Sequence, residues 1–287
     1  MSSSSESDRG DLPDFGATPL VEVALAASFS PLADLRTSHL GLLWGRYFKE
    51  KFPHTDDQPR LEARREILDA DEAEKLKYHV ELSNTAPLNR VWFLDKAGDE
   101  LLQIQEDYIA HNWRKQGAEP YPRYEAIRGN FHRELELLEQ FVREESLGDL
   151  SYTQCEITYV SHIEPSSIWK THGELGRVVT VFNPVYSDGF LNEPEGVQFA
   201  LRYRIIDHEG NARGRLHLSL DSVHRGRDRA PIFVLRCTAR GEPIGEGVKG
   251  VLEFLDLGRE WAVRGFTSVT TEEMHRLWDR KDGNLVS

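Results

Sequence analysis

Residues suited to catalysis or ligand binding are concentrated between Leu101 and Glu125. This segment contains an acid, a histidine, an arginine and four aromatic side chains, namely Asp107, Tyr108, His111, Trp113, Arg114, Tyr121 and Tyr124. A carboxylate and an imidazole within hydrogen-bonding reach are the parts of general acid–base catalysis, whereas aromatic rings with a few polar groups line pockets for small ligands or partner peptides. The same residues also suit a packing seam, with tyrosine hydroxyls hydrogen-bonded and an arginine stacked on a ring. The residue types favour packing, and ligand or partner binding stays open as the alternative.

A second candidate is the basic stretch "HRGRDR" at 224–229, which contributes Arg225, Arg227 and Arg229. Arginines are common on solvent-exposed turns, so a turn between two strands is the favoured interpretation. The net charge of −13 opposes binding to a phosphate backbone. These arginines are therefore candidates for nucleic-acid contact only if they line up with Arg202 and Arg204 on one face.

Two further motifs resemble sites for a cofactor or a metal. "GEGVKG" at 245–250 matches the glycine pattern of dinucleotide-binding turns, but "RGEPI" separates it from the preceding strand, and that strand belongs to an antiparallel run. "WKTHGEL" brings together Lys170, His172 and Glu174, whereas metal sites generally need three or four ligands at a known spacing. We therefore expect close packing at the glycines, no cofactor and no metal. No pattern completes a catalytic signature, so no catalytic residue is predicted.

The composition is that of an ordinary globular chain. Of its 287 residues, 39% are hydrophobic and 29% are charged, and no apolar run approaches the roughly 20 residues that a membrane span requires. Residues 1–18 are polar and lack the order of a secretory signal, so we expect a disordered leader and a cytoplasmic protein. Cys155 and Cys237 each lie in a strand-like run with no second cysteine nearby, which predicts buried free thiols.

The elements that must position the candidate residues follow from hydrophobic periodicity. In the first half the pattern predicts a strand, an amphipathic helix, a surface helix, a hairpin and a long helix, at 20–29, 39–52, 62–76, 90–105 and 124–148. Residues 101–113 are predicted to form one strand whose odd positions place Asp107, His111 and Trp113 on a shared face. These side chains are then either together in a cleft or together in solvent.

The second half repeats this order. It predicts a strand, a short helical stretch, three antiparallel strands and two helices, at 153–163, 166–176, 197–205, 214–223, 231–239, 247–257 and 270–280. Thr270 and Glu273 have the spacing of a capping box at the last helix. We therefore predict an α+β fold of two similar halves, each an antiparallel sheet with helices packed on one face. The predicted domains cover 19–149 and 150–287.

Several patches of the sequence resemble a known family. These patches are "PLVEVALAASFSPL", "RVWFLDKAGDELLQIQEDYIAHNWRK" leading to "YPRYE", "QCEITYVSHI" and "FTSVTTEEMHRLW", and together they extend from about Pro19 to Trp278. They look like a sporadically distributed family of uncharacterised bacterial proteins. The resemblance implies no activity, cofactor or site residue. The sporadic occurrence of the family suggests genes that move horizontally, as in defence or toxin–antitoxin systems.

The leading hypothesis is a cytoplasmic, non-enzymatic binding or regulatory protein of two domains, with no membrane association. Its sheet faces or the cleft between its halves would hold a protein partner or a small ligand. One alternative is a hydrolase or nuclease effector of a defence system, using Asp107, His111 and Arg114, or His172 and Glu174. That alternative requires these side chains to converge in one concave pocket. The other alternative is a nucleic-acid-binding accessory protein.

Overall fold

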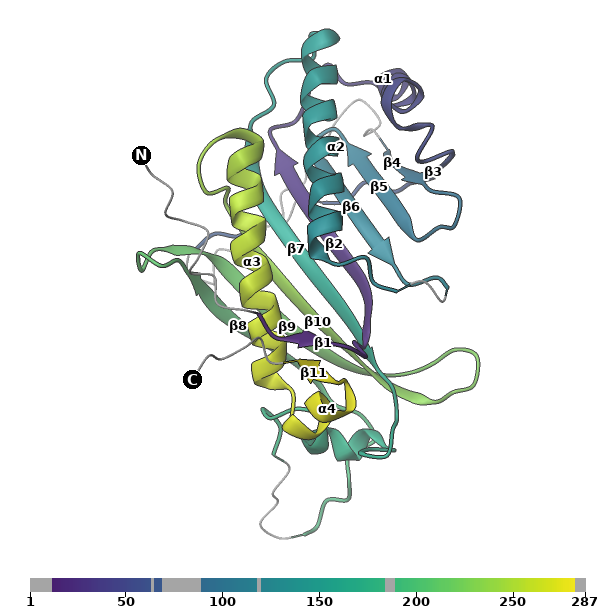
Figure 1. Cartoon of the computed structure of the whole chain (residues 1–287), viewed down its shortest axis with the longest axis vertical. Helices are drawn as coiled ribbons and strands as arrows, with labels where there is room; N and C mark the ends of the chain where they lie inside the picture. The colour runs from purple at the N-terminus through teal and green to yellow at the C-terminus, as the bar shows by residue number, and fades with distance from the viewer. Residues whose placement is uncertain (1–11, 63–64, 69–88, 118–119, 184–188, 282–287) are drawn as a thin grey trace.

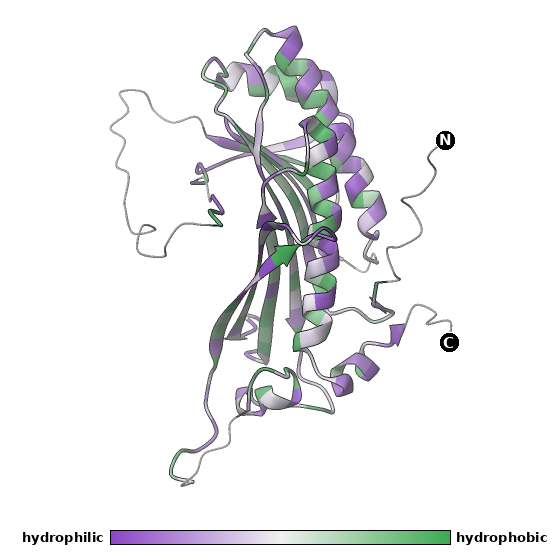
Figure 2. Cartoon of the chain, turned by 90° about the vertical axis from the view of Figure 1, so that its left-hand side faces the viewer, coloured by the Kyte–Doolittle hydropathy of each residue, from purple (hydrophilic) through white to green (hydrophobic). Residues whose placement is uncertain are grey.

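The predicted α+β class is confirmed by a computed structural model of the chain, which describes residues 12–62, 65–68, 89–117, 120–183 and 189–281. Its main element is a nine-stranded antiparallel sheet. The two long helices lie on the same face of this sheet (Figure 1). Seen from the side, the helices form one layer and the strands the other (Figure 2). We call the face opposite the long helices the open face.

The first half of the chain provides one edge and the centre of the sheet. Its elements are β1 (Asp14–Phe15), β2 (Leu20–Phe29), α1 (Thr37–Leu43), a π-helical turn (Trp44–Phe48), β3 (His54–Gln58), β4 (Arg90–Leu94), β5 (Glu100–Gln105), β6 (Tyr108–Arg114) and α2 (Tyr124–Glu144). The hairpin predicted over 90–105 is β4 and β5. The surface helix predicted over 62–76 lies mostly outside the described residues, and residues 65–68 within it are not helical.

The second half follows the same order. Its elements are β7 (Tyr152–Ile163), a 3₁₀ helix (His172–Arg177), β8 (Gln198–Ile206), β9 (Ala212–His224), β10 (Pro231–Gly241), α3 (Gly247–Val269), α4 (Glu272–Leu277) and β11 (Arg280–Lys281). Strand β11 pairs with β1, outside the main sheet. Residues 14–15 of the expected leader are therefore structured.

The two halves share one sheet. Its strand order is β3-β4-β5-β6-β2-β7-β10-β9-β8, so the first strand of each half lies beside the last strand of that half's meander. The two first strands, β2 and β7, pair with each other, for example at Leu25 and Ile157. The predicted boundary at 149–150 lies in the connection between α2 and β7. The long helices, one from each half, are consequently neighbours over the middle of the sheet (Figure 1).

The core lies between this helix layer and the sheet. Successive side chains of a strand point to opposite faces, and the helix-facing set of β2 is fully buried at Val23 and Leu25. The stripe of α2 includes Ile127 and Phe131, which are also fully buried. The prediction of buried free cysteines is confirmed at Cys155 and Cys237. Burial raises the pKa of both thiols, that of Cys237 to about 12, so they are inert at neutral pH.

The prediction of a single strand over 101–113 is wrong. A turn at Glu106 and Asp107 divides it into β5 and β6, which pair in register from Gln105–Tyr108 outward. The two-residue turn changes the parity, so that even positions of β5 and odd positions of β6 face the helices. Alternation alone does not reveal this change, because residues on both faces of the hairpin are buried, such as Leu101 and Leu102 of β5 and Ile109 and Ala110 of β6.

Two helix predictions also need correction. Helix α3 continues to Val269 rather than ending near Leu257. Gly258 interrupts its apolar stripe because the helix approaches the sheet closely there; a Cβ at this position would lie 2.8 Å from Ile157 Cγ2. At α4 the N-cap is Thr271, whose hydroxyl accepts a hydrogen bond from the Met274 amide, and not Thr270.

Candidate functional site

The hairpin separates the candidate residues of the opening segment into two groups. His111 and Trp113 point to the helix layer, since they pair with Leu25 and Val23 of β2. Tyr108 and Arg114 have the opposite parity and lie on the open face. Asp107, in the turn, reaches the open face as well, where Gln105 donates a hydrogen bond of 2.5 Å to it.

Asp107 and His111 therefore do not meet. The enzyme alternative built on Asp107, His111 and Arg114 requires their side chains to converge, but the sheet separates His111 from the other two. Arg114 instead stacks on the ring of Trp92, with its Cζ 5.5 Å from the centroid. This geometry gives no support to acid–base catalysis by the three residues.

His111 has a different partner, Glu134 of α2. Its Nδ1 lies 2.9 Å from both carboxylate oxygens of Glu134, and the two residues are 0% and 4% exposed. Lys51 lies beside them, 3.7 Å from Glu134 and 2.8 Å from Glu100. The sequence did carry a signal for Glu134, because it lies three residues after Phe131 on the buried stripe of α2.

Three of the predicted aromatic residues come together where the two halves meet. Trp113 lies under Tyr121, with their ring centroids 5.2 Å apart. Tyr121, three residues before α2, and Tyr124, the first residue of α2, line a cavity of about 440 Å³ whose other walls are α3 and residues around β1. Tyr159 of β7 is also part of its lining. We call this cavity the interhelical cleft.

The tyrosines of the cleft keep their protons. Burial raises the pKa of Tyr121 to about 12, although a hydrogen bond with Tyr159 lowers it in part. Burial also raises the pKa of Tyr124 and of Tyr159 well above the ordinary value. Tyrosine hydroxyls in this state are hydrogen-bond donors and weak bases. The cleft can therefore orient a ligand but offers no tyrosinate to attack it.

Polar contacts between α2 and α3 fix the wall of the cleft. Tyr124 donates a hydrogen bond of 2.9 Å to Asp256, and Arg128 holds the same carboxylate with two hydrogen bonds of 2.8 and 2.9 Å. Arg259 lies over the Tyr124 ring at 4.5 Å from its centroid and forms an ion pair of 2.8 Å with Glu125. The bidentate pair is specific in geometry, so the two helices are held at a defined separation.

A second cavity, of about 450 Å³, lies on the open face. Asp107 and Tyr108 line it together with Gln154 and with residues 60–62, which cross this face. Arg60 forms an ion pair of 2.8 Å with Asp107. The amide of Leu61 donates to Gln105 Oε1, and Gln105 Nε2 donates to the Leu61 carbonyl, both at 3.0 Å. Asp107 and Tyr108 thus belong to a different cavity from Tyr121 and Tyr124.

The basic stretch 224–229 forms the turn between β9 and β10, as the favoured interpretation predicts. Arg225 is held by Asp228 at 2.7 Å and by Glu164 at 2.8 Å. Arg202 and Arg204 lie further along the sheet, on the open face, opposite His217 and Arg215. Arg227 and Arg229 lie in the turn beyond the end of β9, and therefore not in the row of Arg202 and Arg204.

The remaining motifs have local structural roles. Glu174 accepts hydrogen bonds from the amides of Lys170 and Thr171, at 2.6 and 3.1 Å. The ring nitrogens of His172 lie 3.2 and 3.3 Å from backbone carbonyl oxygens, so this imidazole faces away from Glu174. At the start of α3, a Cβ on Gly250 would lie 2.5 Å from the Gly245 carbonyl oxygen, which explains close packing there.

The described residues contain neither a cluster of metal ligands nor a membrane-spanning helix. Across 12–62, 65–68, 89–117, 120–183 and 189–281, no group of three or more His, Cys, Asp or Glu side chains is placed to hold a metal ion. Within the same residues no helix has the length and apolar character needed to cross a membrane.

Comparison with known proteins leaves the site to be interpreted from its own geometry. No family model, no curated protein and no solved structure matches the chain. The resemblance to a bacterial family noted from the sequence stays a prediction.

Proposed function

We propose that this chain is a binding protein whose interhelical cleft holds a small ligand with an aromatic body and an anionic group. The observation that supports this most directly is the cleft itself. Its volume of about 440 Å³ lies within the roughly 300–1,000 Å³ that is typical of small-molecule sites. Phe266 and Ala262 of α3 offer apolar surface, and the tyrosine hydroxyls offer hydrogen bonds.

The charge of the ligand is inferred from Arg259. Its guanidinium lines the cleft and is held by the Tyr124 ring on one side and Glu125 on the other. Arginine recognises carboxylates through a planar pair of donors. The side chain of Glu125 is 68% exposed, so a ligand carboxylate can replace it at Arg259 at little cost in desolvation.

A binding role suits these groups better than catalysis. The buried His111 and Glu134 pair does not line the cleft. Tyrosines with raised pKa are poor general bases at neutral pH. We further propose a cytoplasmic location and, following the sequence resemblance, a place in a mobile defence or toxin–antitoxin system, for which the neighbouring genes are the test.

Isothermal titration with indole-3-acetate and 4-hydroxybenzoate as probes tests the proposal. Val263 lines the cleft, so V263W is expected to fill it and to abolish heat of binding. Lys249→Trp provides the control, because Lys249 lies on the same helix with a side chain that is 87% exposed. Binding of neither probe to the wild type, or equal binding to both variants, would contradict the proposal.

A further inference from the structure

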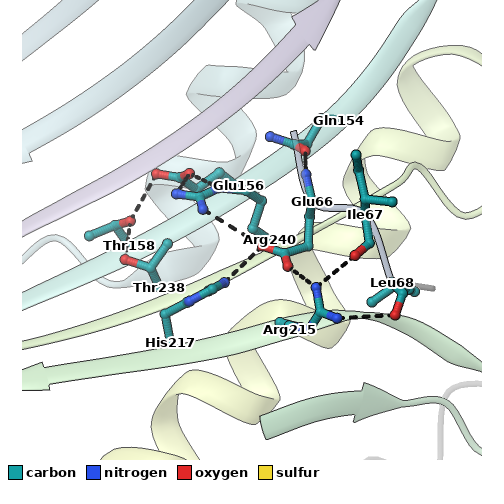
Figure 3. A network of polar contacts seen from close by, with 10 residues as sticks. All are labelled: Glu66, Ile67, Leu68, Gln154, Glu156, Thr158, Arg215, His217, Thr238 and Arg240. Atoms are coloured by element: carbon teal, nitrogen blue, oxygen red, sulfur yellow. Dashed lines mark hydrogen bonds and ion pairs between the residues drawn. The ribbon is translucent and has the colours of Figure 1, made fainter. Parts of the chain in front are cut away.

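A short extended segment of the chain lies across the open face over β7, β10 and β9 (Figure 3). It consists of residues 65–68 and is held mainly through Glu66. The Glu66 carboxylate is hydrogen-bonded by Arg215, lies 2.8 Å from His217 Nε2 and lies 3.8 Å from Arg240 Nη1. Its side chain is only 6% exposed. Burial opposes ionisation, but the hydrogen bonds from His217 and Arg215 prevail and lower the pKa of Glu66 to about 2.

The same site also contacts the backbone of the segment. The Glu66 amide donates a hydrogen bond of 2.5 Å to Gln154 Oε1. Arg215 donates to the carbonyl oxygens of Ile67 and Leu68, at 2.9 and 3.0 Å (Figure 3). The strands thus recognise one carboxylate, one amide and two carbonyls. Any extended peptide that contains a glutamate presents these groups.

Arg240, which lies near the Glu66 carboxylate, is itself oriented by the sheet. Arg240 is fixed by Glu156 of the neighbouring strand, through contacts of 2.6 and 2.5 Å. Thr158 donates a hydrogen bond to Glu156 and lies 2.9 Å from Thr238 (Figure 3). Such supporting contacts reduce the entropy lost when a ligand binds. The position of Arg240 is therefore fixed by contacts within β7 and β10 that do not involve residues 65–68.

Further arginines lie on the open face beside the residues that hold Glu66. Arg202 and Arg204 of β8 lie in register with His217 and Arg215, on the same face of the sheet. The three arginines of this row lie in a chain with a net charge of −13. Clustering of one sign against the overall charge indicates an anionic partner.

The contacts of residues 65–68 with the sheet favour replacement of this segment by another peptide. Ile67 is 51% exposed, so it contributes little apolar burial, and the contacts of the segment with the sheet are polar. A segment required for the core would bury its large apolar side chains. Beside Gln154 and Glu156 the cavity of about 450 Å³ continues the same path, floored by Ala26 and Ser28, and it has room for further side chains of a longer peptide.

We propose that the open face of β7, β10 and β9 is a binding site for an extended, glutamate-containing peptide of a partner protein, and that residues 65–68 occupy this site in cis. The partner's glutamate replaces Glu66 at Arg215 and His217. Because residues 65–68 are tethered to the site, they compete with the partner at an effective concentration on the order of millimolar. Only a partner peptide that binds tightly enough to displace them occupies the site. This site is separate from the interhelical cleft and does not rest on the function proposed for it.

Fluorescence anisotropy with the full chain tests this site. The probe is a fluorescein-labelled peptide of residues 59–70, PRLEARREILDA, and its control is the same peptide with glutamine in place of Glu66. Removal of the competing carboxylate by E66A is expected to tighten binding of the probe by at least about tenfold relative to wild type, since a charge-assisted hydrogen bond is lost by the competitor. The control peptide should bind E66A at least about tenfold more weakly than the probe.

Further variants distinguish specific from general binding. Adding Arg215→Gln to E66A should abolish binding of the probe, whereas adding Arg236→Gln should leave it unchanged, because Arg236 pairs with Asp221 on the same face outside the site. Glu66→Gln, which keeps the side-chain volume, serves as the second variant if E66A does not fold. Equal affinity for probe and control, or equal affinity of wild type and both Glu66 variants for the probe, would overturn the proposal.

Discussion

Replacement of His111 by leucine is expected to destabilise the protein strongly, because it leaves the carboxylate of Glu134 buried without its main hydrogen-bond partner. Both oxygens of Glu134 contact His111 Nδ1 at 2.9 Å, whereas the ammonium of Lys51 lies 3.7 Å away. Loss of one member of a buried polar pair costs about 3 kcal/mol. Glu134→Leu instead leaves the imidazole of His111 without its partner and should lower the free energy of unfolding by about 2 kcal/mol. The double variant removes both polar groups, so its free energy of unfolding should fall by no more than about 1 kcal/mol.

Urea denaturation followed by far-UV circular dichroism measures these free energies of unfolding. In a chain of this size, 3 kcal/mol corresponds to a decrease in Tm of about 6–12 °C. The losses of unfolding free energy in the two single variants sum to about 5 kcal/mol, whereas the double variant loses no more than about 1 kcal/mol. The double-mutant cycle should therefore give a coupling energy of about 4 kcal/mol. Glu136→Ala is the control, since Glu136 lies on the same helix with a side chain that is 62% exposed. Additive single effects would refute the reasoning that the pair acts as one buried unit.

Further outcomes are expected at Glu66, at two glycines and at Tyr124. The pKa of Glu66 is about 2 in the folded chain, below its ordinary value of 4.5. The ionised carboxylate therefore contributes its full stabilisation above pH 4.5, and this contribution is lost as the pH falls towards 2. The difference in Tm between wild type and E66Q should vanish over that range. Gly258→Ala should lower stability by about 1–3 kcal/mol, because its Cβ would lie 2.8 Å from a side chain of β7. Gly129→Ala, where nothing lies within 4 Å, should instead raise it by about 0.5–1 kcal/mol. Tyr124→Phe removes the hydrogen bond to Asp256 and should cost about 1 kcal/mol in chemical denaturation.

Much of the fold could be predicted because its signals are local. The alternation of β2 and the stripe of α2 lie within single windows of sequence, and the structure contains both at the predicted positions. The prediction of one strand over 101–113 was wrong because residues on both faces of β5 and β6 are buried, which conceals the change of parity at the turn of Glu106 and Asp107. Helix α3 was predicted too short, since glycines that let a helix approach a sheet resemble the end of a helix in sequence.

The sites were harder to predict because their partners are distant in sequence. The tyrosines of the interhelical cleft could be identified as candidates, but the cleft's other wall comes from α3, more than a hundred residues later. Glu66 lies 149 residues from Arg215 and 151 residues from His217. Only the register of the sheet brings such residues together, and register depends on all the strands at once.

Strand β7 connects the two proposed sites. Its side chains alternate between the faces, so Tyr159 reaches the interhelical cleft while Glu156 and Thr158 support the cationic site on the open face. Its pairing with β2 and β10 determines which residues reach each face. A slip of one residue in this pairing would exchange the two sets, placing Glu156 in the core and Tyr159 in the polar face. The buried set of β7, including Cys155 and Ile157, excludes that slip energetically. The apolar core that holds β7 in register therefore also determines the chemistry of both faces.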